Sequence, residues 1–256
     1  MRFELSLTLN CKERGAILPL SYQYELSSWI YKVLNEGDPS FALWLHEMGY
    51  KALNMPFKLF TFSNLIIPEY RIAGDRLNIL SPNIRLILSF LPDEAITPFI
   101  TGLFKERHFV IGDKMSQVAF EVSQISAIPK VEFQEKMVFR TISPLFVSRI
   151  DAITRDQIYL SPESEGYSNQ IHQNLQDKYE AFNKRKPDPD LPQTQIRLLS
   201  KSKSKLISIK TGTSEESRLK AYNFTFEISG SKELIETGYW GGFGKLGSQG
   251  FGCVGV

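Results

Sequence analysis

Residues 238–256 read GYWGGFGKLGSQGFGCVGV and hold eight of the seventeen glycines in this 256-residue chain. Two Gly-Phe-Gly triplets, at 242–244 and 250–252, enclose the five residues Lys245 to Gln249. Glycine adopts positive φ at little cost and lets another backbone come close. Apolar side chains in the same stretch, such as Trp240 and Phe251, argue against a free linker. The pattern predicts a loop whose main-chain N–H groups hold a bulky partner such as phosphate.

Charge is distributed unevenly along the chain. The formal net charge is +2, yet residues 181–256 contain 12 Lys and Arg against 7 Asp and Glu. The basic excess lies in the half that carries the glycine stretch, which favours a polyanionic partner there. Two cysteines without a CxxC motif indicate neither a disulfide framework nor a zinc site. Without a signal-peptide pattern or a membrane-spanning apolar run, the sequence predicts a cytoplasmic protein with no membrane partner.

Hydrophobic periodicity predicts an α+β protein. In the first half the expected elements are a strand at 2–9, helices at 21–35 and from Pro39 to Gly49, extended segments at 57–67, 71–81 and 84–90, a helix at 93–106 and a strand at 118–128. In the second half they are an extended segment at 138–147, a helix at 164–185, strands at 195–199, 206–211 and 219–229, a helix at 231–237 and a closing strand at 251–256. Both halves follow the order βαββαβ, so two tandem ferredoxin-like domains are expected, at 1–130 and 131–256.

A cluster of cations follows the proline-containing connector at 186–193. The segment RLLSKSKSKLISIK carries five of them: Arg197, Lys201, Lys203, Lys205 and Lys210. Cations at alternating positions of a strand share one face, and a two-stranded ribbon can bind nucleic-acid phosphates. The other interpretation is a solvated sheet edge that lysines protect against aggregation. Spacing alone does not decide between them.

One histidine lies on a helix face with a possible chemical role. On the helix beginning at Pro39, His46 points away from the expected stripe of Phe41, Leu45 and Met48. Tyr31 does the same on the preceding helix, and Lys51 and Lys58 follow shortly after His46. These residue types suit RNA cleavage without a metal, because His transfers protons near neutral pH and Lys or Tyr stabilises phosphoryl charge.

The other two histidines have less distinctive surroundings. His108 is expected at a helix end and His172 on a helix surface. A lone surface histidine most often has no function, and spacing by itself leaves this interpretation open for His46 as well. The sequence also shows no carboxylate cluster typical of two-metal sites, and no cofactor is expected.

The sequence resembles the CRISPR-associated endoribonucleases of the Cas-six family, within the repeat-associated mysterious protein superfamily. The stretch GFG-KLGSQ-GFG matches every fixed position of the family's C-terminal signature, in which five residues separate two Gly-hydrophobic-Gly triplets. LHEMGYK and FKLFTFS are similar to the family's histidine-containing helix and the strand after it. TISPLFV, at 141–147, resembles the start of its second domain. The resemblance extends over the whole chain.

This resemblance implies cleavage of the long CRISPR transcript within each repeat to produce guide crRNAs. The 2′-hydroxyl would attack without a metal and leave 2′,3′-cyclic phosphate and 5′-hydroxyl ends. The implied catalytic residues are Tyr31, His46 and Lys51, with Lys58 as the competitor for the lysine. Lys245 and the cations of 197–210 would bind repeat RNA, supported by Gly242, Gly244, Gly247, Gly250 and Gly252. The glycine loop would shape the RNA-binding side of the second domain, apart from the reaction centre.

Two other functions remain open from sequence. The first is a non-catalytic RNA-binding subunit of a CRISPR effector complex, which would have the same fold and bind other subunits. The second is a ferredoxin-like enzyme for a small molecule, which would bind no RNA even at low salt. Monomer and homodimer are equally compatible with the sequence.

Overall fold

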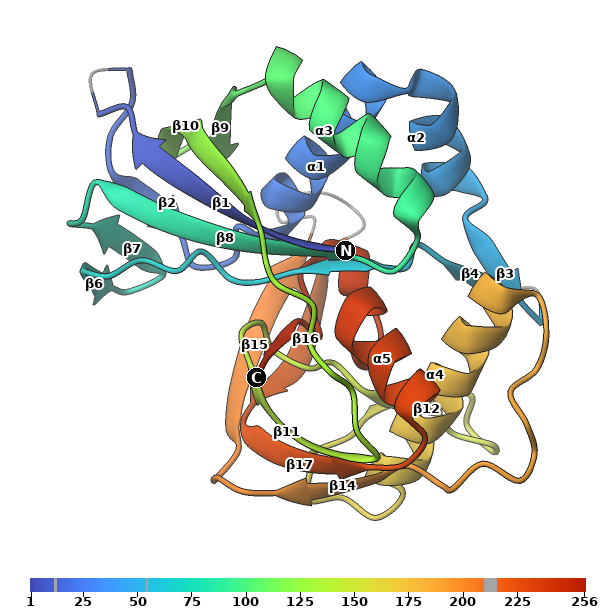
Figure 1. The fold of residues 1–256 in the computed structure, drawn as a ribbon. Helices are drawn as coiled ribbons and strands as arrows, with labels where there is room; N and C mark the ends of the chain where they lie inside the picture. The colour runs from blue at the N-terminus through green and yellow to red at the C-terminus, as the bar shows by residue number, and fades with distance from the viewer. Residues whose placement is uncertain (12, 54, 210–215) are drawn as a thin grey trace.

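The computed structural model describes residues 1–11, 13–53, 55–209 and 216–256 (Figure 1). The chain forms two halves, one above the other in Figure 1, and each is built on an antiparallel sheet. We call residues 1–127 the first half and residues 128–256 the second half. The α+β class predicted from periodicity is confirmed.

The first sheet has the strand order β5-β8-β1-β10-β9. Its strands are β1 (Arg2–Leu9), β5 (Phe60–Phe62), β8 (Asn83–Phe90), β9 (His108–Gly112) and β10 (Gln117–Ala127). Alternation places Leu5 and Leu7 of β1 in the core, where they are 0% and 1% exposed. Because β1 lies between β8 and β10, with β5 beyond β8, the first half has the ferredoxin-like order.

Three helices belong to this half: α1 (Gln23–Gly37), α2 (Pro39–Glu47) and α3 (Ile96–Lys105), the last preceded by a 3₁₀ turn, Asp93–Ala95. They lie on one side of the sheet, at the top of Figure 1. Leu26, Ile30 and Val33 form the fully buried stripe of α1. A Cβ on Gly102 of α3 would lie 1.7 Å from the Val33 carbonyl oxygen, so the close α1–α3 contact requires glycine there.

The second sheet has the order β14-β17-β11-β18. Its elements are β11 (Lys136–Thr141), α4 (Tyr167–Asn183), β14 (Gln195–Leu198), β17 (Thr225–Ser229), α5 (Lys232–Gly241) and β18 (Val254–Gly255). The order along the chain and across the sheet is again ferredoxin-like, as predicted. Ser231 caps α5 by accepting a hydrogen bond from the Leu234 N–H.

Short strands are inserted around these two sheets. They are β2 (Ile17–Pro19), β6 (Tyr70–Ala73) and β7 (Arg76–Ile79) in one small sheet, and the pairs β3 (Tyr50–Ala52) with β4 (Met55–Phe57), β12 (Ser148–Ile150) with β13 (Gln157–Tyr159), and β15 (Lys203–Ile209) with β16 (Ser217–Asn223). The single strand predicted at 219–229 was wrong: it divides at Phe224 into β16 and β17, which belong to different sheets.

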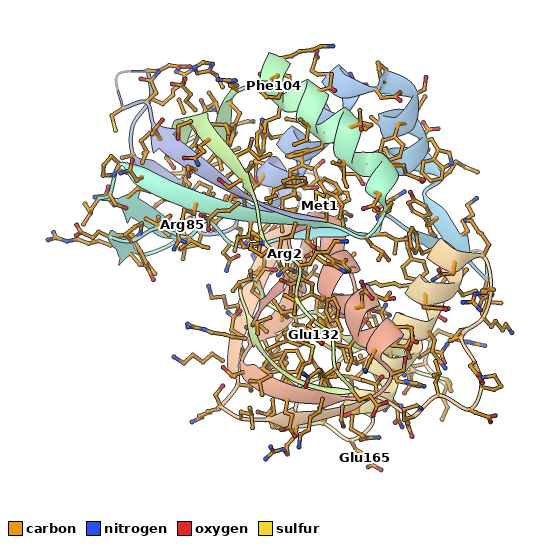
Figure 2. The ribbon with its side chains drawn as sticks, in the orientation of Figure 1. Met1, Arg2, Arg85, Phe104, Glu132 and Glu165 are labelled. Carbon is orange, nitrogen blue, oxygen red and sulfur yellow. The ribbon has the colours of Figure 1, made fainter. Side chains whose placement is uncertain are left out.

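A buried arginine joins the two halves. Arg2 lies between them in Figure 2 and is 2% exposed. Its guanidinium donates to the carbonyls of Val254 at 2.7 Å and Tyr239 at 2.6 Å, and lies 3.6 Å from the centre of the Tyr239 ring. Thr61 Oγ1 adds a hydrogen bond to the Phe251 carbonyl at 2.8 Å. Strand β1 is therefore fixed to the glycine-rich end of the chain.

None of the helices in the described part of the chain is both long enough and apolar enough to cross a membrane.

Candidate active site

His46 lies on the exposed side of α2. Asp38 begins this helix by accepting a hydrogen bond from the Phe41 N–H at 2.9 Å, and Pro39 occupies its first position. Gly49, at φ +60°, follows its end. The predicted stripe was partly wrong, because Met48 is 48% exposed and Ala42 is buried beside Leu45 in its place.

Tyr31 of α1 meets His46 edge to face. The two ring centroids are 5.2 Å apart with an interplanar angle of 84°, and Tyr31 also packs edge to face on Phe60 at 5.6 Å. Tyr31 is half-buried rather than fully turned away from the core. Burial raises the pKa of Tyr31 to about 12, although a hydrogen bond with the Ser248 side chain opposes the rise. Its hydroxyl is therefore protonated at neutral pH and can donate a hydrogen bond.

Two lysines flank this pair, and Lys58 contacts the histidine residue. Lys58 Nζ donates to the main-chain carbonyl of His46 at 2.6 Å, where a cation also complements the C-terminal end of α2. Burial, and then the nearby ammonium of Lys51, lower the pKa of Lys58. Lys51 itself is exposed, with Nζ 3.9 Å from Met48 Sδ. The geometry favours Lys58 over Lys51 as the lysine of this cluster.

The glycine loop reaches the same cluster. Its 3₁₀ turn, Gly247–Gln249, places the Ser248 carbonyl 2.6 Å from Ser27 Oγ of α1, and the Ser248 side chain bonds to Tyr31. A Cβ on Gly247 would lie 2.7 Å from the Phe60 carbonyl oxygen. The loop therefore lies beside Tyr31, one of the residues expected at the reaction centre.

The loop is a packed structural element in which Phe243 and Phe251 are fully buried. Gly242, Gly244, Gly250 and Gly252 all have positive φ. The N–H groups of Phe243, Lys245 and Gly252 donate to the carbonyls of Gly252, Phe146 and Pro144 at 2.9 Å each. A phosphate nest formed by these N–H groups is therefore excluded, and the first interpretation of the loop was wrong at these positions.

Lys178 of α4 holds the loop from inside the protein. Its ammonium donates to the carbonyls of Gly241, Gly242 and Gly244, at 2.8 Å for the last. The residue is 4% exposed, and burial lowers the pKa of Lys178 to about 7. The sequence gives no sign of this role, because Lys178 occurs in a helix with many other polar residues.

A cleft of about 600 Å³ lies between the halves beside this cluster. Cations from three separate segments line it: Lys58 after β4, Arg149 of β12 and Lys245 of the glycine loop, and the buried Lys178 of α4 also contributes to the lining. Asp177 is the carboxylate in the lining, and its Oδ1 accepts from Gln173 Nε2 at 2.8 Å. The charge of this cleft is suited to a phosphodiester.

The cationic row predicted at 197–210 is divided in the structure. β14 pairs with β17 whereas β15 pairs with β16, so Arg197 does not share a ribbon with Lys203 and Lys205. Arg197 binds both carboxylate oxygens of Glu227, at 3.0 Å each. Lys201, Lys203 and Lys205 are exposed, and Lys210 lies outside the described residues. The prediction that all these cations share one face of a ribbon was therefore wrong at Arg197.

The other histidines also differ from expectation. His108 begins β9 rather than ending a helix, and its Nε2 is 3.5 Å from Glu121. His172 is half-buried, and its Nδ1 accepts from the Thr194 N–H at 3.1 Å. Sequence reasoning also missed Arg149 and Ser248, because long-range folding alone brings them to the cleft and to Tyr31.

Comparison with known proteins places these features in a family. Residues 17–126 match the model "CRISPR-associated protein Cas6, N-terminal", and residues 128–256 match "CRISPR associated protein Cas6, C-terminal". The chain belongs to the Cas6 family. Its Cas6 relatives include "CRISPR-associated endoribonuclease Cas6 1" of Methanocaldococcus jannaschii, 30% identical over 99% of this chain and 92% of that protein.

Solved structures agree with this Cas6 membership. "Characterization of a Cas6-related gene from Pyrococcus furiosus" superposes with a TM-score of 0.84 at 27% identity, covering 100% of this chain and 98% of the other. "An RAMP protein binding different RNA substrates" gives 0.82 at 26% identity, covering 99% and 98%. The resemblance to the Cas-six family inferred from sequence is confirmed.

Proposed function

We propose that this Cas6 family member is an endoribonuclease that cuts CRISPR precursor transcripts within the repeat and so produces guide crRNAs. The observation that supports this most strongly is the contact between Tyr31 and His46, with Lys58 on the His46 carbonyl. The endoribonuclease name of the M. jannaschii relative supports the same function. The RNA-binding description of one superposed structure supports RNA as the partner.

The proposed chemistry is internal transesterification. The 2′-oxygen bonds to the adjacent phosphorus while the bond to the 5′-oxygen breaks, giving a 2′,3′-cyclic phosphate and a 5′-hydroxyl. One proton leaves the 2′-hydroxyl and one reaches the departing oxygen, so the step needs no external reactant. His46 is the proton-transfer group, because imidazole exchanges protons near neutral pH.

Tyr31 and Lys58 act on charge rather than on the moving proton. The Tyr31 hydroxyl is protonated at neutral pH, and burial raises its pKa further, so it donates to a phosphoryl oxygen. The Lys58 ammonium stabilises the negative charge that grows on that group, and Lys51 is the competing candidate. No metal takes part in this scheme, so excess chelator leaves the rate unchanged, and a requirement for Mg²⁺ would refute it.

The decisive experiment is single-turnover cleavage of repeat RNA by wild-type protein and by His46→Ala. We expect the variant to lose about 10²–10⁴-fold in rate with RNA affinity retained. His108→Ala is the matched control, because His108 is exposed on the far strand β9. Replacing the nucleotide before the cut by its 2′-deoxy form must also stop cleavage. A wild-type protein that binds the repeat and cuts nothing would instead be a non-catalytic subunit.

The cytoplasm is the compartment we propose for this activity. The cysteines Cys11 and Cys253 are both free thiols, which fits a reducing environment.

A further inference from the structure

One face of α4 forms a polar wall of the cleft between the halves. Its residues recur at intervals of three and four, which places them on the same side of the helix: Gln170, Gln173, Asn174, Asp177 and Lys178. Ile171 and Leu175 lie beside this face and are fully buried in the second core. The helix therefore presents carboxamide groups to the cleft where an ordinary buried helix would present apolar side chains.

Two carboxamide oxygens at this wall have no hydrogen-bond donor within the described residues. Asn174 is 9% exposed, and its Oδ1 is buried without a partner. The same holds for Oε1 of Gln249, which lines the cleft from the glycine loop. Gln173 uses its Nε2 on Asp177, which leaves its own oxygen as an acceptor. Because a buried acceptor without a donor costs free energy, this wall is suited to a ligand that brings N–H groups.

The remaining walls of the cleft fit the other parts of a nucleotide. Phe57, Ile150 and Leu246 supply apolar surface for the faces of a base. Lys58, Arg149 and Lys245 supply cations for its phosphates. Lys58 also contacts the His46 carbonyl, so the cleft begins at the proposed reaction centre. Its volume of about 600 Å³ lies in the range typical of small-ligand sites.

Building on the endoribonuclease function above, we propose that this cleft binds one nucleotide adjacent to the scissile phosphate and that Asn174 determines which base is accepted. The unpartnered oxygens of Asn174 and Gln249 accept from the exocyclic amino group of adenine, cytosine or guanine. Uracil has no amino group, and its single N3–H, with a carbonyl oxygen on each side, satisfies at most one of the two acceptors. The cleft therefore selects an amino-bearing base over uracil at one nucleotide beside the cut.

The test uses the full chain with repeat RNAs that carry A, C, G, U or an abasic site at each nucleotide flanking the cut. Both equilibrium RNA affinity and single-turnover cleavage are measured. We expect an amino-bearing base to be preferred over uracil by about tenfold at one of the two positions. The Asn174→Leu variant should show no base preference. Its affinity for the abasic RNA and its rate of cleaving it should equal those of the wild-type protein.

Asn169→Leu is the matched control on the same helix. Asn169 is exposed, and its Oδ1 accepts from Gln193 Nε2 at 2.7 Å, so this variant should keep the base preference. If Asn174→Leu does not fold, Asn174→Ser removes the same carboxamide, and equal treatment of all bases in the wild-type RNA series overturns the inference without any variant.

The outcomes separate this inference from the proposed function. If the wild-type protein cleaves RNA with equal affinity and rate for all bases, the nucleotide-site inference is overturned and the endoribonuclease function stands. A base preference that persists in the Asn174 variants has the same consequence. A base preference in affinity without any cleavage supports the nucleotide site and refutes the endoribonuclease. A chain that binds none of these RNAs overturns both.

Discussion

Ser27 Oγ of α1 donates a hydrogen bond of 2.6 Å to the main-chain carbonyl of Ser248, 221 residues further along the chain. This bond joins the helix that carries Tyr31 to the glycine loop that bonds to the Tyr31 hydroxyl. The family signature and the proposed catalytic residues are therefore parts of one site, although they lie near opposite ends of the sequence. We predict that the loop supports the reaction by holding Tyr31 in place.

Removing that bond should slow the reaction more than it weakens RNA binding. Ser27→Ala leaves the Ser248 carbonyl without its donor, at a cost of about 1 kcal/mol in the free energy of unfolding. We expect single-turnover cleavage to fall by about tenfold, because misplacement of one group lowers the rate. Ser28→Ala is the control, since the Ser28 hydroxyl donates to the Tyr24 carbonyl within the same helix. Equal cleavage rates for the two variants would contradict the coupling.

The two candidate lysines can be separated by parallel substitutions. Lys58→Ala should reduce the cleavage rate by about 10²-fold, because it removes the ammonium that contacts the His46 residue. Lys51→Ala should cost less than about tenfold, since Lys51 is exposed. Single-turnover rates at saturating protein provide the comparison. A larger loss in the Lys51 variant would reverse the assignment.

Lys178 should make stability depend on pH. Burial lowers its pKa to about 7 in the folded chain, from a reference value of 10.5. Between these values the unfolded chain binds more protons, so the free energy of unfolding rises with pH by about 1 kcal/mol per unit. Lys178→Met removes this contribution. Urea titrations of both proteins at pH 7.5, 8.5 and 9.5 measure the difference, and parallel curves would show that Lys178 does not titrate in this range.

A side chain at Gly252 should destabilise the folded protein for steric reasons. A Cβ there would lie 2.0 Å from the Phe243 carbonyl oxygen, at φ +76°. Gly74 has φ +60° with open space around it, so Gly74→Ala isolates the conformational cost, about 1 kcal/mol. Gly252→Ala should lose at least about 3 kcal/mol or not fold, as measured by denaturant unfolding. Similar losses for the two variants would mean that the close contact is unimportant.

The exposed lysines of β15 should contribute to RNA affinity through counterion release. Lys203→Ala with Lys205→Ala should reduce the slope of log affinity against log salt by about 2. Arg197→Ala should change the slope little, because Arg197 is already paired with Glu227. Affinity measured at several salt concentrations tests both statements. A larger effect of Arg197 would show that its ion pair opens on RNA.

Local pattern was sufficient for most of the fold. The alternation in β1 and the apolar stripe of α1 depend on neighbours in sequence, so both elements were predictable. The Asp38-Pro39 start of α2 and the orientation of His46 follow for the same reason. The motif at residues 242–252 identified the family, because the spacing of its glycines is visible in the sequence. In the structure four of these glycines have positive φ.

Other features depended on contacts between distant segments. Only the tertiary structure places Ser248 on Tyr31, divides the cationic segment between two sheets, and favours Lys58 over Lys51 at the His46 carbonyl. It also reveals the buried ammonium of Lys178 and the amide wall of α4 around one cleft. Sequence by itself determined which elements form and which residues can do chemistry. Packing between the halves decided which of them meet, because a contact over 200 residues leaves no periodic trace in the chain.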